Sequence, residues 1–207
     1  MKRAMRLPLA LRALTGQLGA QWERERRDTL FLMAPVLVAT LSHLSWLPWW
    51  VGTGFLVLFA WRLGLLFSGR WLPRASVRWA AALASTAAVW AHYGTLIGRE
   101  PGVALLVLFL GLKLMEMRAK RDLFVVIFLS LFLLLAAFLH SQSIATAAIV
   151  LIGLAGLLSA MLTMQYRSHE APILHRLRIV GALMLQALPL AVVIFVLFPR
   201  PGGPLWG

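Results

Sequence analysis

The chain has 207 residues with no cysteine, 61% of them hydrophobic, a mean hydropathy of +0.84 and a formal net charge of +13. A soluble domain of this length could not bury so large an apolar fraction in its core, and the missing cysteines exclude a disulfide framework, a thiolate metal site and a cysteine nucleophile. The basic residues form short clusters between long apolar runs, a pattern that argues against nucleic acid binding and is typical of membrane proteins.

Residues 1–28 predict a basic amphipathic segment at the cytoplasmic membrane surface. Leu11, Leu14, Leu18 and Trp22 recur at helical spacing, which favours a helix lying in the interface. A basic tail without fixed structure is the alternative. A signal peptide is excluded, because Arg12 interrupts the apolar stretch and no small-residue cleavage site follows it.

Residues 29–198 predict an all-α membrane domain of seven spans. Each run approaches the roughly 20 apolar residues that a spanning helix needs, and continuous apolar runs exclude a lipid-facing barrel, whose strands would alternate. The first two runs are separated only by residues 46–50, so they form either a helical hairpin or one re-entrant element. The predicted spans are Thr29–Leu47, Trp49–Phe67, Val77–Ile97, Pro101–Met117, Leu123–Leu139, Ser143–Gln165 and Leu177–Phe198.

Two of these spans carry small residues that predict helices in the interior of the bundle. Ala80, Ala84 and Ala88 share one face of the third span, and Gly156 and Ala160 share one face of the sixth. Because lipid gives helices no hydrophobic reason to associate, close backbone approach at small residues is what brings them together.

The distribution of Lys and Arg predicts the orientation. Of the 20 basic residues, 18 lie either before the first span or at span ends on the same side of the membrane as the N-terminus. The two exceptions are Arg99 and Arg200. Basic residues stay in the cytoplasm during insertion, so the N-terminus is predicted inside and the C-terminus outside.

The densest group of ionisable residues follows the fourth span. Lys113 and Glu116 are three residues apart and Arg118 and Asp122 four apart, so each pair would share one helical face. The group is either a self-neutralising helix end or a charged site for a partner or substrate. Its candidate functional residues are Lys113, Glu116, Arg118, Arg121 and Asp122.

On the predicted outer side, residues 92–102 contain three glycines and a proline, which indicates a defined turn. Arg99 is an exception, because it is a basic residue on the predicted outer side. It either pairs with Glu100 or an anionic partner, or is simply solvated. Thr95 in this loop and Gln142 in the next outer loop complete the candidate residues.

No cofactor, metal or catalytic site is predicted. His43, His92 and His140 fall near the outer ends of spans, but no HxxH or HxxxH spacing supports coordination. There is also no P-loop, no dinucleotide motif and no HExxH sequence.

Several motifs in a fixed order nevertheless resemble a known family. They are YGTLIGREPG at 93–102, KLMEMRAKRD at 113–122, SQS at 141–143, FPR at 198–200 and GPLWG at 203–207. From about residue 28 to its end, the chain resembles the N-terminal membrane domain of the TgpA-type transglutaminase-like proteins of bacterial inner membranes.

The resemblance implies a multi-pass protein of the bacterial inner membrane whose C-terminal segment, 199–207, leads to an exported transglutaminase-like domain with a Cys-His-Asp triad. That family is linked to the cell envelope. Because this chain has no cysteine, no catalytic residue carries over, and the chain alone is not expected to be an enzyme.

Three functions follow as hypotheses. The first is an anchor and interaction domain that positions a periplasmic transglutaminase-like domain, in cis or as a separate subunit. The second is a binding or carrier site for a lipid-linked or small anionic envelope precursor. The third, a membrane enzyme using His92, Arg99 or Glu100, is disfavoured because no nucleophile accompanies these groups.

Overall fold

The computed structural model describes residues 26–69, 72–117, 120–165 and 173–197, and within them all regular structure is helical. A first helix covers 26–41, and one further helix falls on each of the other predicted apolar runs. The all-α prediction is confirmed, whereas the segments predicted at 1–25 and 199–207 lie outside the described residues. The further helices are α2 (Trp49–Ser68), α3 (Ala75–Tyr93), α4 (Arg99–Leu114), α5 (Lys120–Ala137), α6 (Ile144–Gln165) and α7 (Ile173–Leu197).

Three of the described helices are long and apolar enough to cross a membrane. Their apolar segments are Trp49–Ser68, Ile144–Thr163 and Leu174–Ile194. By contrast, α4 has 16 residues and α5 begins with three charged residues. A 16-residue helix is about 24 Å long, less than the roughly 30 Å of a hydrocarbon layer. A membrane-associated domain is therefore supported, and seven spans remain a prediction.

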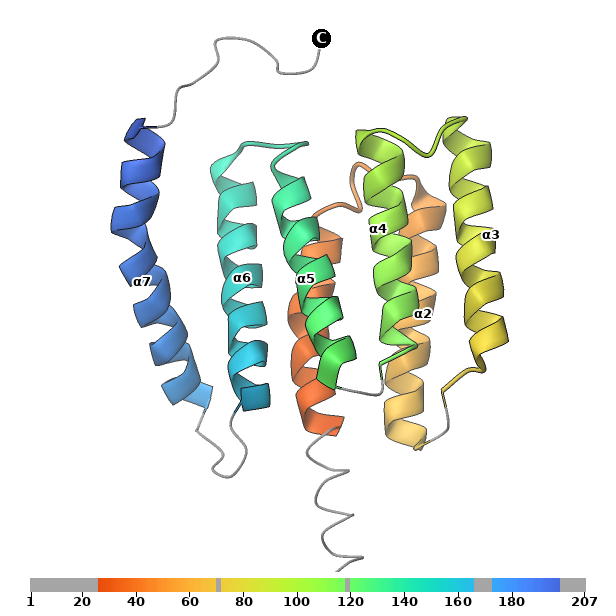
Figure 1. Cartoon of the computed structure of the whole chain (residues 1–207), viewed down its shortest axis with the longest axis horizontal. Coiled ribbons are helices and arrows are strands. Elements are labelled where there is room, and N and C mark those ends of the chain that lie inside the picture. Colours follow the sequence, from red (N-terminus) through yellow and green to blue (C-terminus); the bar gives the residue numbers. More distant parts are fainter. Residues whose placement is uncertain (1–25, 70–71, 118–119, 166–172, 198–207) are drawn as a thin grey trace, which may run out of the picture.

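The helices form two layers (Figure 1). Helices α3, α4, α5, α6 and α7 follow one another in a row, each packed against the next. Behind this row stand the 26–41 helix and α2, which packs against α4.

The 26–41 helix and α2 form a helical hairpin. At one end Arg26 lies over the ring of Phe67, with 4.8 Å between the guanidinium carbon and the ring centroid. At the other end the side chain of Leu44 fills the space beside Gly52. Contacts at both ends mean that the chain returns along its own path. Whether the pair forms two spans or one re-entrant element stays a prediction.

The core lies between the hairpin and the middle of the row. Leu32, Phe55, Leu110 and Leu133, from four different helices, are fully buried. At the edges of the row, Val89 is the single buried residue of α3, and α7 contributes only Arg176 and Val180 among its described side chains.

The prediction that the third span is an interior helix is therefore wrong. Ala80, Ala84 and Ala88 all face away from the bundle and are exposed, because α3 turns its other side toward α4. The spacing of the alanines defined a face correctly, but it carried no information on whether another helix covers that face.

The corresponding prediction for α6 is confirmed. A Cβ atom added at Gly156 would lie 2.8 Å from Cβ of Pro35, and one added at Gly153 would lie 2.8 Å from Cδ2 of Leu134. Glycine at these two positions lets the 26–41 helix and α5 approach the α6 backbone closely.

Candidate functional site

The candidate residues lie at the two ends of the bundle. We call the end at which α2, α4 and α6 finish the basic end, and the opposite one, with the loops 42–48, 94–98 and 138–143, the loop end (Figure 1). Among the described residues, every Lys and Arg except Arg99 belongs to the half of its helix or turn nearest the basic end. The sequence therefore concentrates positive charge at one end.

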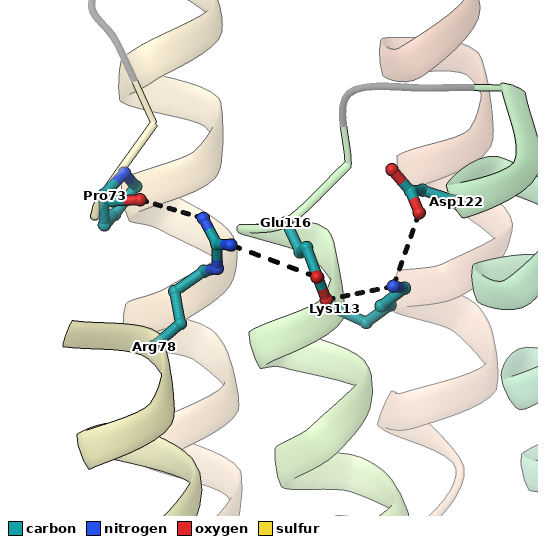
Figure 2. Close-up of polar contacts among 5 residues, drawn as sticks. All are labelled: Pro73, Arg78, Lys113, Glu116 and Asp122. Atoms are coloured by element: carbon teal, nitrogen blue, oxygen red, sulfur yellow. Dashed lines mark hydrogen bonds and ion pairs between the residues drawn. The ribbon is translucent and has the colours of Figure 1, made fainter. Parts of the chain in front are cut away.

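At the basic end, Lys113 near the end of α4 binds two carboxylates (Figure 2). Its Nζ lies 2.9 Å from Oε2 of Glu116 and 3.5 Å from Oδ1 of Asp122. The first contact confirms the pair expected from their spacing along the chain. The second crosses the turn between α4 and α5, so it depends on how these helices meet.

A fourth residue, Arg78 of α3, joins the group. Its Nη2 lies 3.9 Å from Oε1 of Glu116, and its Nη1 donates a 2.9 Å hydrogen bond to the carbonyl oxygen of Pro73 (Figure 2). We call Arg78, Lys113, Glu116 and Asp122 the ion-pair cluster. It links three helices, α3, α4 and α5, at one end of the bundle.

The two carboxylates of the ion-pair cluster differ in burial. The side chain of Asp122 is 11% exposed, whereas that of Glu116 is 47% exposed. Solvent screens the Glu116 pairs, so each contributes about 0–1 kcal/mol to stability, while neutralising a partner of the more buried Asp122 would cost more. The Asp122 carboxylate is accordingly the less screened of the two, and the Glu116 carboxylate the more accessible to solvent.

The other two predicted members, Arg118 and Arg121, are not among the residues of the ion-pair cluster as defined. The side chain of Arg121 is exposed. Arg118, expected to pair with Asp122, lies outside the described residues, so that pair stays a prediction.

The structure adds a residue that was not a candidate from sequence. Arg62 in α2 is only 7% exposed, and its Nη2 donates to the carbonyl oxygen of Met117 at a long 3.4 Å. Its Nε is buried without a hydrogen-bond partner. Arg62 forms no ion pair with any residue that the structure describes. Arg62 lies at helical spacing from Phe55 and Phe59, which are both buried, and this spacing could have predicted that Arg62 is on the buried face of α2.

At the loop end, Arg99 begins α4 and donates a 2.8 Å hydrogen bond from Nη1 to the carbonyl oxygen of Leu139, just after α5. The bond joins the start of α4, directly after the 94–98 loop, to the 138–143 loop. Glu100 lies in the first turn of α4, where a carboxylate is favoured by the helix dipole. No contact pairs it with Arg99 among the described residues, and both side chains are exposed.

The remaining two candidates serve their own loops or face solvent. The Thr95 hydroxyl accepts a 3.1 Å hydrogen bond from the backbone N–H of Ile97, which closes a small turn before α4. Gly94, with a left-handed φ of 69°, ends α3 at Tyr93, earlier than expected, and Gly98, with a φ of 143°, directly precedes α4. Gln142 is exposed in the 138–143 loop.

Two of the three histidines near the loop end lie together. His43 is fully buried, with Nε2 2.8 Å from the carbonyl oxygen of Leu133, and its ring centroid is 6.0 Å from that of His140. His92 instead lies beside Trp50, at 5.8 Å between centroids. Within the described part of the chain, no three His, Asp or Glu side chains converge as metal ligands would.

The chemistry available at both ends is binding and positioning. The described polar residues offer charged pairs and backbone hydrogen bonds, and no acid–base pair adjoins a nucleophile among them. At the loop end, the 94–98 loop connects α3 to α4 and the 138–143 loop connects α5 to α6, and Arg99 at the start of α4 binds the second of these loops (Figure 1).

Comparison with known proteins gives two matches. The model of the TgpA N-terminal domain family matches residues 31–207. The chain is also 38% identical over 175 residues to a protein-glutamine gamma-glutamyltransferase of Pseudomonas aeruginosa. That alignment covers 84% of this chain and 26% of the relative, so the chain spans about a quarter of the relative's length. No solved structure matches the chain.

Proposed function

The chain belongs to the TgpA N-terminal domain family, and on this premise we propose that it is the inner-membrane anchor of a transglutaminase-like envelope protein. In this proposal seven helices cross the membrane and position a periplasmic enzyme domain, which follows in the same chain or binds as a separate subunit. The relative's name supplies the activity, gamma-glutamyl transfer, and the chain's part is to hold that activity at the membrane surface.

The observation that carries the proposal is the extent of the match together with the missing cysteine. The chain aligns with a region amounting to 26% of a named transferase, and this chain contains no cysteine that could act as a thiol nucleophile. A role in anchoring and contact fits a helical, apolar region better than a role in the transfer reaction does. The interaction surface in this proposal is the loop end, where Arg99 at the start of α4 binds the 138–143 loop.

The charge distribution supports a definite orientation for the anchor. Ten of the eleven described Lys and Arg residues belong to the basic end, and only Arg99 belongs to the loop end. In this proposal the basic end faces the cytoplasm and the loop end the periplasm, as the retention of basic residues in the cytoplasm requires.

Because the chain has no cysteine, single cysteines test this orientation cleanly. A membrane-impermeant maleimide added to spheroplasts should label Thr95→Cys and Gln142→Cys, and should label Arg121→Cys only after lysis. All three positions are exposed, so access to the reagent depends on the side of the membrane. Labelling of Arg121→Cys in intact spheroplasts would overturn the orientation.

The anchoring role needs its own experiment. A transglutaminase-like domain joined after Gly207 should sediment with membranes and be released by protease added outside spheroplasts. The matched control lacks residues 29–198 and should leave the same activity in the soluble fraction. Membrane-bound activity in that control would show that residues 29–198 are not required for anchoring, and would contradict the proposal.

Arg62 favours a second candidate function, a binding or carrier site for an anionic envelope precursor. It is a buried cation with an unpartnered Nε and no carboxylate partner among the described residues, at the basic end near Met117. An ionisable group held inside a membrane domain is a functional-site hypothesis by default, and basic pockets between helices bind anionic head groups.

The second candidate is tested by binding of a long-chain lipid phosphate to the chain in nanodiscs of neutral lipid, followed by native mass spectrometry. Arg62→Gln should reduce the bound fraction about tenfold, whereas the exposed Arg121→Gln should leave it within about twofold. Equal losses in the two variants would indicate general charge attraction and would count against a site at Arg62.

A further inference from the structure

Helix α7 stands at the edge of the bundle and is attached near one end only (Figure 1). Near its start Arg176 is buried and donates a 2.8 Å hydrogen bond from Nη1 to Oγ1 of Thr163 on α6. Beyond Val180, its described side chains are exposed, apart from the partly buried Met184. Only 6% of the apolar segment Leu174–Ile194 is buried in the chain.

One polar side chain lies in the middle of this exposed helix. Gln186 is exposed, and it makes no hydrogen bond with the residues that the structure describes. Three residues later, Pro189 lies inside the helix and has no N–H to donate. The carbonyl oxygen of Leu185, four residues before it, therefore loses its usual helical donor. The side-chain amide of Gln186, which can both donate and accept, is therefore next to the Leu185 carbonyl oxygen on α7.

In a bilayer, leaving these two groups without a hydrogen-bond partner costs free energy. The hydrocarbon layer contains no water to satisfy an amide or a carbonyl, so polar groups at that depth pair with other helices. Glutamine is one of the residues that form hydrogen bonds between membrane helices. Lipid alone can cover the leucines and valines of α7, but it cannot satisfy Gln186.

We propose that two copies of this chain associate through α7, with Gln186 of each copy hydrogen-bonded to the other copy across a two-fold axis normal to the membrane. Copies inserted with the same orientation bring Gln186 to the same depth, so each meets an identical residue. The amide carries both donors and an acceptor, so it is complementary to its own copy, and the Leu185 carbonyl adds a second acceptor.

The neighbours of Gln186 on its face suit a close approach. Ala182, Pro189 and Val193 lie four residues before, three after and seven after it, which places all three on the same side of the helix. All are exposed. The buried Arg176 and Val180 lie on a different side, toward α6, so beyond Val180 the Gln186 face remains open after α7 has packed on its own bundle.

Single cysteines in the full chain test the interface, reconstituted in phosphatidylcholine vesicles at low protein density and oxidised with copper phenanthroline. Ala182→Cys and Val193→Cys should form disulfide-linked dimers. Leu188→Cys, equally exposed but on the opposite side of the helix, is the matched control and should remain monomeric. Cross-linking at all three positions alike, or at none, would overturn the proposal.

Substitution of Gln186 then separates the hydrogen bond from simple proximity. In the Val193→Cys background, Gln186→Leu should lower the cross-linked fraction about three- to tenfold, and Gln186→Asn should retain most of it. Gln142→Leu, which removes the same group from a loop, should have no effect. An unchanged fraction in Gln186→Leu would overturn the proposal. The inference rests on α7 crossing the membrane, which is tested independently by maleimide labelling in spheroplasts of His175→Cys and Leu197→Cys, both exposed and near opposite ends of α7. Leu197→Cys should be labelled before lysis and His175→Cys only after it.

Discussion

Lys113 and Asp122 lie nine residues apart on consecutive helices, with 3.5 Å between Nζ and Oδ1 across the turn that joins α4 to α5. The same ammonium group also binds Glu116 at 2.9 Å, so one lysine serves a local and a distant carboxylate. The two carboxylates differ in exposure, 11% for the Asp122 side chain and 47% for Glu116. They should therefore differ in what they contribute to stability.

We expect Asp122→Asn to lower the free energy of unfolding by about 1–2 kcal/mol and Glu116→Gln by less than about 0.5 kcal/mol. The reason is that solvent already screens Glu116, whereas a neutral amide in place of the Asp122 carboxylate would leave a poorly solvated Lys113 with one partner fewer. Equilibrium unfolding in mixed detergent micelles measures both values. Equal losses would show that the pair across the turn contributes no more than the local one.

Gly156 and Gly181 provide a matched pair for helix packing. Gly156→Ala should destabilise the chain by about 1–3 kcal/mol, because the added Cβ would lie 2.8 Å from Cβ of Pro35. Gly181→Ala meets nothing within 4 Å and should be neutral or slightly stabilising. Thermal melting followed by size-exclusion chromatography compares them. A harmless Gly156→Ala would mean that the 26–41 helix and α6 can separate freely.

Arg99→Ala should lower the free energy of unfolding by about 1 kcal/mol through the loss of its hydrogen bond to the Leu139 carbonyl. Amide hydrogen exchange should rise in both the 94–98 and the 138–143 loops, since the bond joins the start of α4, directly after the first loop, to the second. Arg121→Ala removes an exposed arginine at the other end and should change neither loop. Faster exchange confined to the 94–98 loop would argue against the link.

Thr163→Val removes the hydroxyl that accepts a hydrogen bond from Arg176, one of the few contacts of α7 with the bundle. We expect hydrogen exchange near the start of α7 to increase, with a loss of about 1–2 kcal/mol of stability. Thr53→Val, whose hydroxyl binds only its own helix and is exposed, is the control. Unchanged exchange in Thr163→Val would show that other contacts suffice for α7.

The sequence was sufficient for the helices because each apolar run is long and ends at charged or polar residues, glycines or prolines. It also predicted the Lys113–Glu116 pair, which depends only on helical spacing. Contacts between helices were a different matter. Arg78 is 35 positions from Lys113 and joins the ion-pair cluster only because α3 packs against α4.

Helix α3 illustrates the same limit for packing. Ala80, Ala84 and Ala88 share a face as predicted, yet that face is exposed and α3 lies at the edge. Periodicity shows which residues lie together on a helix, and the neighbours of that helix are decided by the whole bundle. The burial of Arg62 was not predicted, because the sequence groups this arginine with the basic residues at the cytoplasmic ends of the spans. In the structure its side chain is buried.

Helices α4 and α5 are joined at both of their ends, by Arg99 to the Leu139 carbonyl at one and by Lys113 to Asp122 at the other. Sliding α4 along α5 by one turn would break both links together, so their register is fixed and the two helices move as one rigid pair. Any rearrangement of this domain must then take place at the peripheral helices. Of these, α7 is attached to its own bundle mainly near its start, so its far half can shift against that bundle together with the α7 of the second copy.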